Sequence, residues 1–262
     1  MKVGVFQFCP KFGEITDNLN RITEALVKTD ADLVVLPELC VSGYQFVSQS
    51  EVRSLCEPVP DGESVRRFEQ ICEEKPMFLV AGIGERDGNV CYNASVLVGP
   101  AGLIAVYRKI HLFAEEKNWF EQGNRPFQVN DIGTARLGMM ICYDWIYPES
   151  ARSLAMSGAD IICHPSNLVL PYCPDAMITR SIENRIFTAT ANRTGKEARG
   201  GKTTLDFIGK SQITNPEGDR LVQFGTDEEG IKVTEIDVKL ARNKRVTPVN
   251  HLWEDRRPEL YS

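Results

Sequence analysis

The sequence lacks any long apolar run and any excess of basic residues. A transmembrane helix needs about 20 consecutive, mostly apolar residues, and no segment of the 262-residue chain provides them. The chain carries 30 lysines and arginines against 36 aspartates and glutamates, which gives a net charge of −6 at pH 7. A nucleic-acid partner would favour a basic face. We therefore expect neither a membrane-spanning protein nor a nucleic-acid-binding one.

Histidine is scarce, and the cysteines are not paired along the chain. The only histidines are His111, His164 and His251, and none of the eight cysteines belongs to a Cys-x-x-Cys pair. Zinc sites are usually built from such pairs or from several histidines, so no metal site is expected. Most of the cysteines lie in apolar segments, where a thiol is typically a small buried side chain. Residues 1–8 read as a strand rather than as a signal peptide, which predicts a cytoplasmic protein.

Strand-like and helix-like segments alternate along most of the chain. Short apolar runs predict strands at 3–8, 33–36, 78–83, 94–98, 103–107, 137–141, 161–163, 188–191, 211–214 and 221–224. Apolar residues at helical spacing predict helices at 17–29, 62–74, 148–157 and 176–184. Turn signals at 99–102 and 215–218 predict two hairpins. Mixed hairpins and crossovers, without a linker or repeat, predict a single α/β domain over residues 1–262, while the role of the tail after Val238 stays open.

Two predicted strands are followed at once by a charged side chain that suits catalysis. Open α/β sheets place their ligand crevice at the carboxyl ends of strands. Glu38 follows the apolar run 33–36 and Pro37, and a carboxylate pressed against apolar residues has a raised pKa, towards the range of a general base. Lys109 follows the strand at 103–107 and could present an ammonium where negative charge develops. Taken singly, each pattern is more typical of a surface residue.

A third predicted strand runs directly into Cys142. The strand at 137–141 is followed by a few turn residues, and Pro148 suits the first position of a helix. Such a strand–turn–helix lifts the side chain out of the sheet and points backbone N–H groups towards it, ready to bind an oxyanion. The thiol would have a lowered pKa if a cation or a helix terminus lay close.

Together these segments resemble a known family. Pro37-Glu38-Leu39, the segment 107–112 (Tyr-Arg-Lys-Ile-His-Leu) and Ile141-Cys142-Tyr143-Asp144 are similar, in order and spacing, to the three motifs of the nitrilase superfamily of carbon–nitrogen hydrolases. The resemblance extends from residue 3 to residue 242. It implies an α-β-β-α sandwich that forms a homodimer or a higher homo-oligomer. It also implies a thiol hydrolase of non-peptide C–N bonds, with the triad Glu38, Lys109 and Cys142.

The resemblance further implies the roles of single residues. Many members have a second glutamate soon after the lysine motif, and Glu116 is the expected match, with Glu115 as the neighbouring alternative. The segment 181–185 also resembles the family and is expected to be structural or to contact a second subunit. Glu38 would take the thiol proton, and Lys109 with the backbone N–H of Tyr143 would stabilise the oxyanion. No metal and no organic cofactor is expected to take part.

The substrate class is less sharply defined by the sequence. A nitrile, a simple amide and an N-carbamoyl amine can all be attacked by the same thiol. Family members that act on nitriles often have Trp then Glu after the cysteine, whereas this chain has Tyr143-Asp144-Trp145, which favours an amide of the omega-amidase type or a carbamoyl compound. The expected pocket residues are largely aromatic or neutral and favour a small uncharged acyl group, unless Arg152 or Arg180 reaches them. They are Tyr44, Phe113, Trp119, Tyr143, Trp145, Asn167 and Tyr172.

Two other interpretations remain open. One is a Cys–His pair, either Cys163 with His164 or Cys142 with His111. Adjacent residues of a strand point to opposite faces, so Cys163 and His164 are poorly placed to share a proton. The other is a catalytically silent dimer that binds partners through its surface, since a fold can persist without its chemistry. The presence of all three triad positions argues against it.

Overall fold

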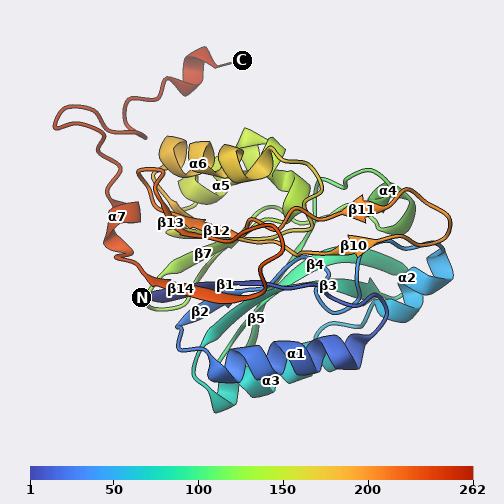
Figure 1. Ribbon diagram of the computed structural model, residues 1–262. Coiled ribbons are helices and arrows are strands. Elements are labelled where there is room, and N and C mark those ends of the chain that lie inside the picture. The colour runs from blue at the N-terminus through green and yellow to red at the C-terminus, as the bar shows by residue number, and fades with distance from the viewer. Residues whose placement is uncertain (262) are drawn as a thin grey trace.

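Two six-stranded β-sheets lie face to face at the centre of the molecule, and helices cover their outer faces (Figure 1). This computed structural model describes residues 1–261. The first sheet has the order β14 (Gly230–Glu235), β1 (Lys2–Gln7), β2 (Leu33–Val35), β3 (Phe78–Asp87), β4 (Val90–Gly99), β5 (Gly102–Arg108). The second has the order β13 (Arg220–Gln223), β12 (Gln212–Thr214), β9 (Phe187–Ala191), β8 (Ile161–Pro165), β7 (Arg136–Met139), β6 (Val129–Asp131). The expected α-β-β-α layering is confirmed.

Each sheet has three parallel strands at its centre and antiparallel strands at its edges. β1, β2 and β3 run parallel, and so do β7, β8 and β9. β4 turns back against β3 and β5 turns back against β4, so β5 points the same way as β2. The carboxyl ends of β2 and β5 therefore lie at the same edge of the sheet, which is how Glu38 and Lys109 come together.

The outer helices are amphipathic and bury their apolar stripes against the sheets. α1 (Ile15–Lys28) and α3 (Glu63–Glu74) cover the first sheet, and α5 (Pro148–Met156) and α6 (Cys173–Asn184) cover the second (Figure 1). In α1 the buried stripe includes Leu19, Ile22 and Leu26. These side chains belong to one hydrophobic core with Val34 of β2 and with Leu36, which follows it. This is the stripe that the helical spacing predicted, and both predicted hairpins, β4–β5 and β12–β13, are also confirmed.

Several short elements escape the sequence patterns. They are α2 (Gln49–Leu55), α4 (Glu116–Trp119), β10 (Lys196–Glu197) and β11 (Leu205–Asp206), beside the edge strands β6 and β14. The strand predicted at 137–141 ends at Met139, because the chain turns before the nucleophile position. The helix predicted at 176–184 already begins at Cys173, since Pro174 fits a first turn.

The C-terminal tail contacts the side of the protein formed by α5 and α6, where Lys244 Nζ donates to Asn184 O at 2.9 Å and Arg152 lies over the Trp253 ring. After α7 (Lys239–Arg242) it extends beyond α6, and it ends in a short 3₁₀ turn, Pro258–Leu260 (Figure 1). Within residues 1–261, no helix combines the length and the apolar character that crossing a membrane requires.

Candidate active site

Glu38 is the third residue after the end of β2 and is completely buried. Its Oε1 accepts hydrogen bonds from Lys109 Nζ and from Asn93 Nδ2, both at 2.7 Å. Its Oε2 is also buried and has no hydrogen-bond partner among residues 1–261. Burial raises the pKa of the Glu38 carboxyl above its usual value, although the Lys109 ammonium opposes the shift. One carboxylate oxygen is thus held in place, while the other is free to accept a proton.

The neighbouring strand makes room for Glu38 at Gly82. A Cβ atom added at this position would lie 2.7 Å from Pro37 O and closer still to Glu38 Cα. β3 can approach residues 37–39 only because residue 82 has no side chain. Gly82 N donates to Pro37 O at 3.1 Å and Leu36 N donates to Val80 O at 2.8 Å, so the strand contact fixes the position of the carboxylate.

Lys109 follows β5 and is completely buried between two carboxylates. Its Nζ lies 2.7 Å from Glu38 and 2.8 Å from Glu116. Its backbone N–H donates to Asn93 O at 2.8 Å, so β4 positions both the base and the ammonium. Burial alone would lower the pKa of Lys109, but the charges of Glu116 and Glu38 outweigh it and raise the pKa. Lys109 is therefore a permanent cation.

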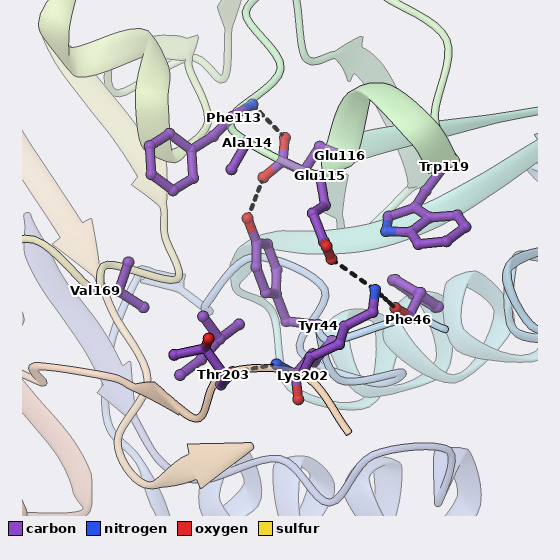
Figure 2. A pocket seen from close by; sticks show the side chains of 12 residues that line it. Tyr44, Phe46, Phe113, Ala114, Glu115, Glu116, Trp119, Val169, Lys202 and Thr203 are labelled. Carbon is purple, nitrogen blue, oxygen red and sulfur yellow. Dashed lines mark hydrogen bonds and ion pairs between the residues drawn. The ribbon is translucent and has the colours of Figure 1, made fainter. Parts of the chain in front are cut away.

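The two adjacent glutamates point in different directions (Figure 2). Glu116 is buried, accepts a hydrogen bond from Tyr44 Oη at 2.7 Å and one from Phe113 N at 3.1 Å, and contacts Lys109. Glu115 is exposed and pairs with Lys202 at 2.6 Å. The geometry thus favours Glu116, rather than Glu115, as the second glutamate of the site.

Cys142 lies at a strained turn three residues after the end of β7. Its φ of +41° lies in the left-handed region, which a residue other than glycine adopts only when its surroundings hold it there. It opens a short 3₁₀ turn, Cys142–Ile146, that leads into α5. The turn lifts the thiol out of the sheet, and Cys142 lines a cavity together with Asn167.

Asp144 stabilises this turn through hydrogen bonds. The carboxylate is completely buried, and its Oδ2 accepts hydrogen bonds from Tyr107 Oη at 2.7 Å and from Ile141 N at 2.8 Å. Its Oδ1 lies 2.7 Å from His111 Nδ1. The segments 107–111 and 141–144 are therefore joined at one carboxylate, next to Cys142.

Neither histidine of the Cys–His interpretation reaches the Cys142 sulfur as a proton acceptor. His164 Nε2 lies 2.9 Å from the carbonyl oxygen of Cys142, not from its thiol. Burial lowers the pKa of His164 to about 4, so the ring is neutral and donates to that carbonyl. His111 is engaged by Asp144 and stacks on Tyr147. His164 therefore supports the strained turn instead of activating the thiol.

The charge balance of the buried site keeps the thiol protonated. Two carboxylates surround one ammonium, so a thiolate would add a second uncompensated negative charge. Burial raises the pKa of Cys142 well above its usual value, and the Glu38 carboxylate acts in the same direction, while Lys109 opposes both. From the sequence we expected a lowered pKa for Cys142 if a cation lay close. Lys109 does lie close, but burial and the Glu38 charge outweigh its effect. A protonated thiol of this kind could act as a nucleophile only with the help of a base.

Two adjoining cavities lead to these groups. The thiol cavity, about 200 Å³, is lined by Cys142, and the glutamate cavity, about 170 Å³, is lined by Tyr44 and Glu116. Phe113 and Val169 belong to the walls of both. The other expected pocket residues also line them: Tyr143, Trp145, Asn167 and Tyr172 in the thiol cavity, Trp119 in the glutamate cavity.

The charges around the cavities differ from the expectation of a neutral pocket. Arg180 donates to Trp145 O at 3.1 Å and Arg152 to Glu183 O at 2.8 Å, and neither lines either cavity. Lys202 does line the glutamate cavity, between Glu115 and the ring of Trp119 (Figure 2). No periodicity singles it out, because it lies in the loop between β10 and β11.

Asn93 is the other site residue that sequence reasoning missed. Asn93 is an ordinary inward-facing residue of β4 by pattern, and only the strand order places it beside Glu38.

In the segment 181–185, Ser181 is buried and hydrogen-bonds to Thr188 and Thr214 at 3.2 and 3.1 Å, which is a structural arrangement remote from the cavities. Residues 1–261 contain no cluster of three His, Cys, Asp or Glu side chains suited to hold a metal ion.

Known proteins resemble this chain in sequence and in structure. The family profile of carbon–nitrogen hydrolases matches residues 2–246. A protein of Pyrococcus abyssi named nitrilase is 45% identical over 265 residues, covering 100% of this chain and 99% of that protein. The carbon–nitrogen hydrolase of Helicobacter pylori G27 is 26% identical with a TM-score of 0.88, over 100% of this chain and 97% of that one.

An amidase structure shows an adduct on its cysteine. It is a variant of the amidase from Nesterenkonia sp. AN1, with the acetamide moiety of fluoroacetamide added covalently at the active-site cysteine. It is 26% identical to this chain with a TM-score of 0.81, and the match covers 99% of this chain and 95% of that one.

Proposed function

The chain belongs to the carbon–nitrogen hydrolase family and is a hydrolase of C–N bonds other than peptide bonds, and we propose that it cleaves a small amide with Cys142, Glu38 and Lys109. The observation that carries these roles is the buried chain Glu38–Lys109–Glu116 beside a protonated Cys142. Of the two carboxylates that contact Lys109, only Glu38 keeps an oxygen without a hydrogen-bond partner among residues 1–261. That oxygen is the proposed proton acceptor.

In the first step Glu38 takes the thiol proton while the Cys142 sulfur attacks the amide carbon. The total charge of the site does not change, because the negative charge moves from the carboxylate to the substrate oxygen. Lys109 and the backbone N–H of Tyr143 stabilise that oxygen. The loss of one such donor typically costs about 10²–10³-fold in kcat.

In the second step protonated Glu38 gives its proton to the departing nitrogen, so that ammonia leaves and a thioester to Cys142 remains. Water, deprotonated by Glu38, then attacks the thioester carbon, and the proton returns to the thiol as the carboxylic acid leaves. Glu38 acts in turn as base and acid, which suits a carboxyl with a raised pKa. The cysteine adduct in the similar amidase supports a covalent route.

Glu116 is proposed to position Lys109. Its carboxylate is held by Tyr44 Oη and by Phe113 N, so it binds the ammonium from a fixed point. This arrangement keeps Lys109 turned towards Glu38 and the Cys142 sulfur rather than towards solvent.

Substrate binding is proposed for the walls of the two cavities. Tyr44, Tyr143 and Trp145 contribute mostly apolar surface, which suits an uncharged acyl group. The Asn167 side chain is buried, and neither its Nδ2 nor its Oδ1 has a hydrogen-bond partner among residues 1–261. Since a buried amide without partners is costly, we expect it to bind a polar group of the substrate.

Ammonia release separates this proposal from its alternatives. The purified protein is assayed with short amides, glutamine-like amides, N-carbamoyl amines and aliphatic nitriles, with Cys142→Ala and Glu38→Gln alongside. We expect an amide to be the best substrate and both variants to lose turnover while remaining folded. A nitrile as best substrate would favour the activity named for the Pyrococcus protein. Normal turnover by Cys142→Ala would refute the mechanism.

We also propose that the protein is a cytoplasmic homodimer. All eight cysteines are free, which is typical of a reducing compartment. On the outer side of α5 and α6, Met156 and Ile182 are 53% and 50% exposed, and an apolar face of this kind suits a second subunit. Size-exclusion chromatography with light scattering tests the dimer, and Ile182→Asp should shift it to monomer. A monomeric wild type would contradict the proposal.

A further inference from the structure

Two cysteines outside the active site lie side by side. Cys56 follows the end of α2, and Cys91 belongs to β4. The Cys56 sulfur occupies the space over Gly84, where an added Cβ would be only 2.7 Å away. Arg86 pairs with Cys91 across β3 and β4, and Gly84 lies two residues before Arg86. Because residues two apart face the same side of a strand, both sulfurs lie on one side of the sheet.

The two cysteines belong to the same buried cluster. Hydrogen bonding with Cys56 lowers the pKa of Cys91 to about 7, and the nearby Arg53 and Arg86 add to this effect against burial. A lowered pKa favours the thiolate of Cys91, which is the reactive form of a cysteine. Cys56 keeps its proton, because the interaction with Cys91 and burial raise its pKa.

Cys91 is only 5% exposed, but it borders a cavity at the surface. It lines a cavity of about 240 Å³ on the surface, together with residues of α4 and of the loop before β4. The lining includes Gln49, Asn89, Trp119 and Glu121. Cys56 does not line this cavity. A reagent from solution would thus meet Cys91 first.

We propose that Cys91 and Cys56 form a peroxide-sensitive dithiol, in which Cys91 is oxidised first and Cys56 closes a disulfide. The Cys91 sulfur attacks a hydroperoxide and breaks its O–O bond, which yields a sulfenic acid and water or an alcohol. The Cys56 sulfur then attacks the Cys91 sulfur, and the S–O bond breaks with release of water. The sulfurs are oxidised and the peroxide is reduced. A cellular thiol would restore the pair.

Five of the other cysteines lack this combination of features. Burial raises the pKa of four that are not in the pair or the active site: Cys40, Cys72, Cys163 and Cys173. Cys142 is accessible through the thiol cavity, but its thiol is protonated at rest. Cys91 lies on β4, two residues before Asn93. Oxidation of Cys91 would therefore occur close to the side chain that hydrogen-bonds to Glu38.

Peptide mapping by mass spectrometry tests this proposal in the folded protein. The fully reduced chain, as wild type and as Cys142→Ala, is treated with hydrogen peroxide at neutral pH, blocked with an alkylating agent and digested. We expect a linked Cys56–Cys91 peptide in both proteins, reversible by a thiol reductant. Because it also forms in Cys142→Ala, the result is independent of the proposed catalytic mechanism.

Single-cysteine variants distinguish the two roles. Cys56→Ser should leave Cys91 as a sulfenic acid that dimedone traps, since the second thiol is missing. Cys91→Ser should leave Cys56 reduced. Cys72→Ser, which removes a buried thiol bonded to Val98 O at 3.9 Å, is the matched control and should form the disulfide at the wild-type rate. If Cys91 stays reduced in folded wild type while other cysteines react, the proposal is wrong.

Discussion

Removing the Asn93 side chain should raise the pH at which the enzyme becomes active. Asn93 Nδ2 donates to Glu38 Oε1 at 2.7 Å in a completely buried site, and this bond lowers the pKa of Glu38. A hydrogen bond to a charged group is worth about 1.5–3 kcal/mol. Since one pKa unit corresponds to about 1.4 kcal/mol, Asn93→Ala should raise the pKa of Glu38 by roughly 1–2 units.

The assay is kcat/KM for the best amide as a function of pH. Glu38 must be ionised in the free enzyme to accept the thiol proton, so its pKa sets the acid limb of this profile. In Asn93→Ala the acid limb should move to higher pH, and activity below both midpoints should fall about 10–100-fold. On the plateau above them the loss should be much smaller, because the charged form of Glu38 is then fully populated.

Ser95→Ala is the matched control, and it defines the outcome that would refute the reasoning. Ser95 is buried two residues further along β4, and its hydroxyl donates to Met139 Sδ at 3.6 Å instead of to Glu38. This variant should keep the wild-type acid limb. If Asn93→Ala folds, as judged by circular dichroism, and its acid limb stays in place or moves to lower pH, then Glu38 is not the group that titrates.

Three further changes probe the site and the fold. Glu116→Gln removes a negative charge that raises the pKa of Glu38, so the acid limb of kcat/KM should move to lower pH; an upward shift in the same titration would contradict this placement. Tyr107→Phe removes the 2.7 Å bond to Asp144 and should lower the free energy of unfolding in urea by about 1–3 kcal/mol. No loss would mean that Asp144 finds another partner. Gly82→Ala places a Cβ 2.7 Å from Pro37 O and should cost about 1–3 kcal/mol of stability together with most of the activity, measured by urea unfolding and ammonia release. A fully active Gly82→Ala protein would show that the Glu38 loop tolerates displacement.

The local elements were predictable because their causes are local. An apolar stripe at helical spacing can be buried only as a helix, which is why α1 was predicted from Leu19, Ile22 and Leu26. The hairpins followed from turn residues between apolar runs. Single-turn elements such as α4 leave no such pattern, because four residues complete only one turn.

By itself the sequence determined the layered fold and the identity of the three central side chains, through motifs that place Glu38, Lys109 and Cys142 at strand ends. The partners and charge states of these side chains depended on the tertiary structure. The order of strands β2, β3, β4 and β5 sets Asn93 against Glu38, and the turn at 113–116 directs Glu116 inwards and Glu115 outwards. Burial among two carboxylates and one ammonium then keeps the thiol protonated. A pKa depends on every charge within a few ångströms and on the water excluded around it, and neither exists until distant segments have packed together.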